Sequence, residues 1–191
     1  WYLSQSHRAV DLLARNNPKA AAELFESLAS KDLGNPDLER RVELTLARLA
    51  YESGNFRKAL GYYENIRGAD PMLRATIMLE RSWCYYRLGD PSRALGLIAM
   101  LESPSFKDVM DTERDLLRAL IYRDLCHFDA AQLAVTSFRT RFGTTIEALR
   151  NRNDMSTSST FRALTHRLPK ISERFALVQN MQSESKRVSD M

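Results

Sequence analysis

Apolar residues recur at steps of three and four along almost all of the first 142 residues. This is the spacing of amphipathic helices, and the two-residue alternation of a half-buried strand is absent from the sequence. Clusters of Gly, Asn, Asp and Pro interrupt the pattern at regular intervals. They predict eight helices, at residues 2–15, 18–31, 37–53, 56–68, 72–88, 91–102, 109–125 and 128–142. The sequence therefore predicts an all-α fold.

The predicted helices form pairs that repeat along the chain. The pairs superpose when four turn residues, 38, 35 and 37 positions apart, are aligned: Asn16, Gly54, Gly89 and Cys126. A small residue then lies seven positions before each turn, an alanine five after it, and a large apolar residue nine after it. Small residues let the two helices of a pair approach closely, and the large residue fills the space between pairs. We expect an α-solenoid of four pairs, at about residues 1–36, 37–71, 72–106 and 107–142.

Two of these pairs resemble a known repeat family. The third pair contains Cys84–Asp90 followed by Ala94-Leu95, and the second contains Leu46-Ala47, Gly54-Asn55-Phe56, Ala59-Leu60, Tyr63 and Pro71. These segments resemble tetratricopeptide (TPR) motifs, and the third pair is loosely similar to TPR proteins of the bacterial cell envelope. The resemblance implies a right-handed solenoid that binds proteins. Arg81 and Arg118 depart from it, since the family usually has leucine there.

The first helix of each pair is expected to line a concave groove. Residues three, six and ten positions before the turn should point into it, with Arg41 and Arg87 at its edges. The predicted partner-binding residues are Arg41, Leu44, Arg48, Tyr51, Leu79, Trp83, Tyr86, Arg87, Leu116, Leu120 and Arg123. Trp, Tyr and Arg dominate binding hot spots, so we expect a partner peptide or helix with apolar anchors and some negative charge. Alternatively, Trp83 and Tyr86 fill a tightly wound solenoid.

A separate segment is predicted beyond the repeats. Residues 143–159 are interpreted as a short helix and a polar linker, and residues 160–191 as an amphipathic helix with Thr160 as its N-cap. Its apolar stripe, at heptad spacing, comprises Phe161, Leu164, Leu168, Ile171, Phe175 and Val178. This stripe either covers the last repeat or pairs in trans, with a partner or with a second copy of the chain.

Charge and composition narrow the partner class. The 191 residues carry a net charge of +4, and residues 150–191 account for all of it. Since no nucleic-acid-binding motif accompanies this charge, we expect no nucleic-acid partner. No apolar run approaches the roughly 18 residues of a membrane span, so we expect no membrane insertion of this segment. Two cysteines without a metal-binding spacing leave the compartment open, cytoplasmic or periplasmic. The chain starts at Trp1, so we interpret it as an excerpt of a longer protein.

Motifs for chemistry are not found in the sequence. The three histidines are isolated, and nucleophile-elbow, zinc-protease, P-loop and dinucleotide-binding patterns are missing. Carboxylates at helical spacing, Glu39 with Glu43 and Asp111 with Asp115, are interpreted as solvated helix faces. We therefore expect a non-enzymatic interaction scaffold without cofactor or metal. Two alternatives remain: an oligomerisation module that assembles through its C-terminal helix, and a regulatory domain of a larger enzyme.

Overall fold

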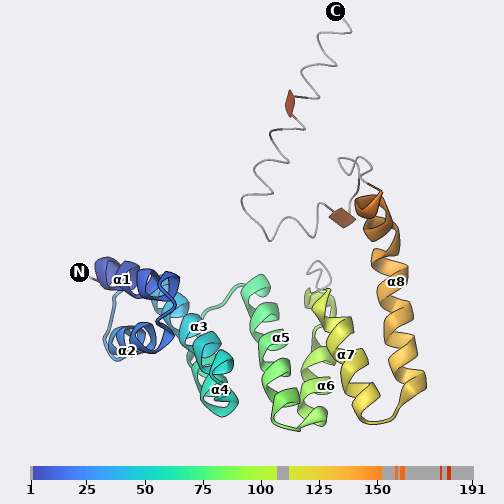
Figure 1. The fold of residues 1–191 in the computed structure, drawn as a ribbon, viewed down its shortest axis with the longest axis horizontal. Coiled ribbons are helices and arrows are strands. Elements are labelled where there is room, and N and C mark those ends of the chain that lie inside the picture. Colours follow the sequence, from blue (N-terminus) through green and yellow to red (C-terminus); the bar gives the residue numbers. More distant parts are fainter. Residues whose placement is uncertain are drawn as a thin grey trace, which may run out of the picture. The chain divides into compact units, whose positions relative to one another are not determined.

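The computed structural model describes residues 2–106, 112–151, 158, 160, 161, 177, 180 and 181. Within the long described stretches the chain forms eight α-helices and one short 3₁₀ helix, and none of the described residues is in a strand (Figure 1). The elements are α1 (Tyr2–Ala14), α2 (Pro18–Ala29), α3 (Pro36–Glu52), α4 (Phe56–Asn65), α5 (Pro71–Arg87), α6 (Pro91–Met100), η1 (Pro104–Phe106), α7 (Glu113–Asp124) and α8 (Phe128–Arg150). The prediction of an all-α fold is confirmed for the described residues, while the right-handedness of the solenoid stays a prediction.

The chain divides into two compact units, Trp1–Val109 and Met110–Met191. The first unit holds three antiparallel helix pairs, α1/α2, α3/α4 and α5/α6 (Figure 1). Within it α3 packs on α2, and α5 packs on α4. The second unit contains the pair α7/α8. No helix in the described part of the chain is both long enough and apolar enough to cross a bilayer.

Each pair is closed by a turn of the same geometry. The four residues used to align the pairs all adopt the left-handed conformation, with φ of 57° at Asn16, 78° at Gly54, 74° at Gly89 and 58° at Cys126. In the second pair the Asn55 N–H donates to the Ala50 carbonyl (2.8 Å) and the Gly54 N–H to the Tyr51 carbonyl (2.9 Å). The other three turns have the same two bonds. This is the Schellman motif, which satisfies carbonyls that a helix end leaves without partners.

Helix starts are also determined locally. Four helices have proline at their first position and an Asn or Asp N-cap whose side chain accepts a backbone N–H: Asn17, Asn35, Asp70 and Asp90. Proline loses nothing there because that N–H has no helical partner. An Ala substitution at such a cap typically costs about 1 kcal/mol. The breaks read from the sequence are therefore physical ends of helices.

The repeat alignment correctly predicts the core of the first three pairs. The aligned small, alanine and large residues there are all buried: Ala9, Ala47, Ser82, Ala21, Ala59, Ala94, Phe25, Tyr63 and Ile98. In the fourth pair Ala119 and Ala131 are only half-buried, and Val135 is 36% exposed. Ala134 is the buried residue of that turn instead. Val135, the large residue nine positions after Cys126, is therefore not buried by the described helices, unlike Phe25, Tyr63 and Ile98.

Two boundaries near the C-terminal end also differ from prediction. Helix α8 continues without a break to Arg150, so residues 143–150 extend it and are not a separate short helix. The Ser158 hydroxyl accepts the Phe161 N–H at 3.1 Å, which makes Ser158 the cap in place of Thr160. Phe161 is half-buried. The other members of the predicted stripe lie outside the described residues: Leu164, Leu168, Ile171, Phe175 and Val178.

Candidate functional site

Aromatic and arginine side chains from α3, α4 and α5 form a partly exposed surface on the first unit. Trp83 and Tyr86 meet edge to face, with ring centroids 6.0 Å apart, and both are half-buried. Tyr51 packs against Phe56 at 5.2 Å, and the Arg87 guanidinium lies 5.0 Å above the Phe56 ring. Burial raises the pKa of Tyr51, while the positive charge of Arg87 acts in the opposite direction. These rings are held by packing and retain accessible edges.

The Glu80 carboxylate joins three helices through bonds from Arg48 and Tyr63. The Arg48 guanidinium on α3 donates to the Glu80 carboxylate on α5, at 2.6 Å from Nη2 and 3.0 Å from Nε. The Tyr63 hydroxyl on α4 donates to the same carboxylate at 2.9 Å. Burial and the neighbouring Glu80 both raise the pKa of Tyr63, so its hydroxyl stays a donor. Arg48 therefore supports the surface, although half of its side chain stays exposed.

The predicted groove residues ten positions before each turn do not line that surface. Leu79 is buried (5% exposed), and Leu44 is half-buried in a cluster with Ile77 and Cys84 of α5. In the second pair this position faces the apolar cluster shared by α3, α4 and α5, whereas α5 itself packs against α4, α6 and η1. We correct the assignment of Leu44 and Leu79 as contact residues. Arg41, at the predicted edge, is exposed.

Three predicted contact residues belong to the second unit. Leu116 is 53% exposed, Leu120 is half-buried, and the exposed Arg123 pairs with Asp124 at 2.7 Å. They lie on α7 of the second unit, whereas α3–α5, which form the surface with Trp83 and Tyr86, belong to the first unit. Leu116 occupies the same repeat position as Leu44 and Leu79, so it belongs to the face between pairs.

Asp115 is not the solvated carboxylate that the sequence suggests. It is 1% exposed and lies among three arginines. Arg141 of α8 forms an ion pair with its Oδ2, while Arg118 lies 3.7 Å and Arg114 4.0 Å from its Oδ1. A buried carboxylate needs such partners, because desolvation without them is costly. Arg118 thus has a role that a leucine in the usual family pattern cannot fill.

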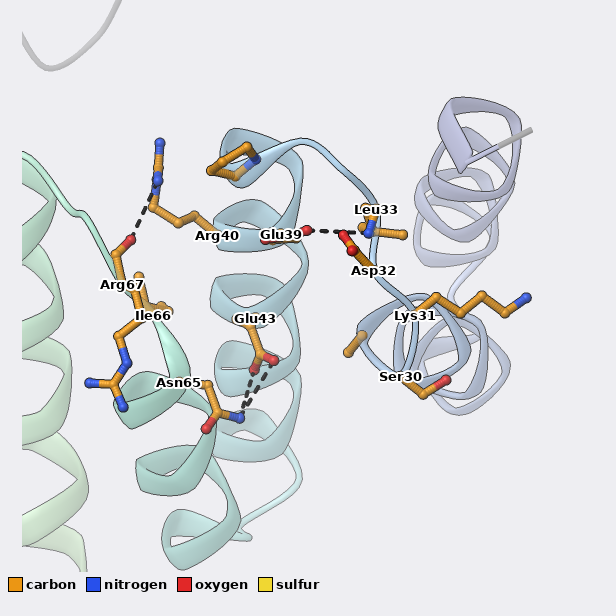
Figure 2. Close-up of a pocket in the computed structure, with 12 residues that line it drawn as sticks. Ser30, Lys31, Asp32, Leu33, Glu39, Arg40, Glu43, Asn65, Ile66 and Arg67 are labelled. Carbon is orange, nitrogen blue, oxygen red and sulfur yellow. Dashed lines mark hydrogen bonds between the residues drawn. The ribbon is translucent and has the colours of Figure 1, made fainter.

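A pocket of about 480 Å³ lies at the ends of the helices in the first unit. Figure 2 shows it between the α2–α3 connection, the start of α3 and the end of α4. The Leu33 N–H donates to Glu39 (3.2 Å), and Arg40 donates to the Arg67 carbonyl (3.4 Å). The sequence alone does not predict this pocket. The breaks at Gly34-Asn35-Pro36 and Asp70-Pro71 indicated the flanking connections, but not their proximity.

Glu43 lies in this pocket with a neutral partner. Its carboxylate accepts only long hydrogen bonds from the Asn65 amide, at 3.4 and 3.5 Å. Burial raises the pKa of Glu43, and the bond from Asn65 partly offsets this effect. Figure 2 shows both side chains pointing toward each other across the pocket. The interpretation of Glu39 and Glu43 as a solvated face therefore does not hold for Glu43.

Comparison of the chain with known protein families gives a match to part of the first unit. A family model described as tetratricopeptide repeat matches residues 44–105, from within α3 to η1. The resemblance read from the sequence is thereby confirmed. The matched segment includes Arg48, Glu80, Trp83, Tyr86 and Arg87. A search of curated proteins found no match to the chain. TPR repeats generally mediate protein–protein interaction and are typically non-catalytic.

Proposed function

We propose that the chain is a protein-interaction scaffold that holds a partner peptide or helix on the surface formed by Arg48, Tyr51, Trp83, Tyr86 and Arg87. The observation that carries this proposal is the continuity of that surface. Glu80 and Trp83 are one turn apart on α5, so they share a helix face. Arg48 reaches that face from α3 through Glu80, and Arg87 lies one turn beyond Trp83.

The chemistry of the surface defines the class of partner. Trp and Tyr edges that are already packed lose little side-chain entropy when a partner covers them. The charge of Arg48 is balanced by Glu80, whereas Arg87 lies over a neutral ring and so retains a net positive charge. The surface therefore suits a segment with apolar or aromatic anchors and an acidic residue near Arg87. Arg41 extends the positive edge along α3.

Selection of peptides from a displayed library on the intact chain tests this proposal. Affinities of the selected peptides are then measured against Trp83→Ala and Arg87→Ala by fluorescence anisotropy. A hot-spot residue contributes about 2 kcal/mol or more, so each variant should weaken binding roughly thirtyfold. Met100→Ala, an exposed apolar residue of α6, is the matched control and should leave affinity unchanged. Selected peptides that bind both variants as tightly as the parent chain would place the interaction elsewhere.

A further inference from the structure

Each helix pair in the first unit has an aligned set of small and apolar residues that forms one buried face. In the first pair Ala9, Phe25 and Leu28 cluster with Val42 and Leu46 of α3. In the second pair the equivalent residues cluster with α5: Leu44, Ala47, Tyr63 and Ile66. In the third pair the equivalents Leu79, Ser82, Ile98 and Leu101 are all buried. The repeat thus defines an apolar face whose burial requires another element.

The same face is open in the fourth pair. The turn alignment places Leu116, Ala119, Val135 and Phe138 at these positions, and they line a groove of about 270 Å³ between α7 and α8. Leu116 is 53% and Val135 36% exposed, whereas the equivalent Tyr63 is 3% exposed. Exposed apolar side chains gathered along a groove indicate a contact surface. The groove has the position and lining of a seat for one more helix.

The sequence beyond α8 supplies an apolar stripe at heptad spacing, with Pro169 as the expected position of a kink. The next apolar pattern after α8 is the stripe formed by Phe161, Leu164, Leu168, Ile171, Phe175 and Val178. The Ser158 cap starts a helix just before Phe161, and the described residues Thr160, Phe161, Leu177, Asn180 and Met181 are helical. Leu177, one position off the stripe, is 60% exposed, as expected for the opposite face.

Chain length permits the return to the groove. Phe138 lies 12 residues before Arg150, which is about 18 Å along the axis of α8. The 8 residues from Arg150 to the Ser158 cap span up to about 28 Å when extended. The stripe can therefore run back along α8 in the antiparallel direction, as α5 does after α4.

We propose that residues 161–178 dock in the groove between α7 and α8 of the same chain, as an amphipathic helix with a kink at Pro169, and cover the open face of the fourth pair. The first helices of later pairs close the first and second pairs in the same way, through α3 and α5. This inference is independent of the proposed partner surface, because it concerns other helices and another segment.

Photo-crosslinking of the full chain tests the docking directly. Benzoylphenylalanine in place of Leu116 should give a cross-link within one chain to a peptide from residues 161–178, detected by mass spectrometry in the monomer band. The yield should not change over a hundredfold dilution. Cross-links found only in a dimer band would assign the groove to a second copy, and cross-links confined to other segments would reject the stripe as occupant. Either result overturns the proposal.

Hydrogen exchange supplies a second readout that needs no cross-link. Leu168→Asp with Ile171→Asp should speed amide exchange in α7 at least tenfold, while exchange in α3–α6 stays the same. Leu177→Asp is the matched control on the same segment and should change α7 exchange less than twofold. Val135→Asp should have an effect like that of the stripe variant, and combining the two should add little, since both break one contact. Unchanged α7 exchange in the stripe variant would overturn the docking.

Discussion

The pairs α3/α4 and α7/α8 have the same type of turn but differ in the surroundings of a carboxylate side chain at an equivalent helix position. Both turns have a left-handed residue, Gly54 or Cys126, and the same two backbone bonds. Glu43 and Asp115 occupy equivalent positions, 11 residues before these turns. Glu43 lines an open pocket opposite Asn65, whereas Asp115 is buried among arginines. The comparison shows that a repeat sequence specifies its turns locally, while the fate of a given helix position depends on which elements cover it.

Neutralising the two equivalent carboxylates should have opposite effects, and Asp115 should give the largest effect. Asp115→Asn leaves Arg114, Arg118 and Arg141 without their shared carboxylate, and breaking a buried ion pair costs about 3 kcal/mol or more. Hydrogen exchange should report this loss in α7 and α8 with α3–α6 unchanged. An exchange pattern identical to the parent's would show that the cluster does not stabilise the second unit.

Replacing an aligned alanine by leucine should cost more stability in the third pair, where the alanine is buried, than in the fourth pair, where it is half-buried. Ala94 is fully buried, so Ala94→Leu should cost about 1–3 kcal/mol in the first unit. Ala131 occupies the same position in α8 but is half-buried, so Ala131→Leu should cost well under about 1 kcal/mol. Urea unfolding followed by exchange in each unit gives both values. Equal costs would mean that the fourth pair is packed like the third.

The left-handed turn residues allow a matched exchange of glycine and side chain. Gly89→Ala meets no atom within 4 Å, so its cost of about 1–2 kcal/mol comes from the backbone conformation alone. Cys126→Gly should instead stabilise the second unit by about 1 kcal/mol, because it relieves the same strain. Gly96→Ala, in the interior of α6, is the control and should stabilise by about 0.5–1 kcal/mol. Thermal melts of the three variants check the signs, and destabilisation by Cys126→Gly would contradict the strain argument.

The smallest expected effect concerns pH and Glu43. Its folded pKa is raised above the ordinary 4.5, so the folded chain binds this proton more tightly. The associated stability is complete below pH 4.5 and is lost as the pH rises through the folded pKa. Glu43→Gln should therefore match the parent at pH 4 and exceed it at pH 7 by less than about 1 kcal/mol. Denaturant unfolding at both pH values tests this, and a variant less stable than the parent at pH 7 would contradict the sign.

The sequence predicted local features of the fold well. The sequence predicts all four turn residues that adopt positive φ, because a Schellman motif depends only on the preceding helix and on a residue that can adopt the left-handed conformation. The aligned alanines of the first three pairs were also correct, since two helices of a hairpin meet at a regular repeat position. Both features depend on residues close together in sequence.

Features that depend on distant elements were predicted less well. Leu79 was assigned to a groove, but α5 packs against α4, α6 and η1 and so buries a wide arc of its surface. Asp115 was read as solvated because Arg141, its ion-pair partner, is 26 residues away. The residue types of the proposed binding surface could be predicted from the sequence. The hydrogen bond between Arg48 and Glu80 could not, because it depends on the tertiary contact of α3 with α5.

The uniform turns also determine where the chain tolerates changes in length. Three residues separate the helices within every pair, for example Ser53–Asn55 between α3 and α4, whereas the connections between the pairs of the first unit that the structure describes in full have six residues (Ser30–Asn35) and five (Ile66–Asp70). One residue inserted within α4 would rotate the rest of that helix by about 100°, turning its apolar face away from α3. A residue inserted between pairs, away from Leu33 and Ile66, lengthens a connection without rotating a helix, at a small entropic cost. Epitope tags and spectroscopic labels therefore belong at these between-pair connections, and evolutionary insertions should accumulate there as well.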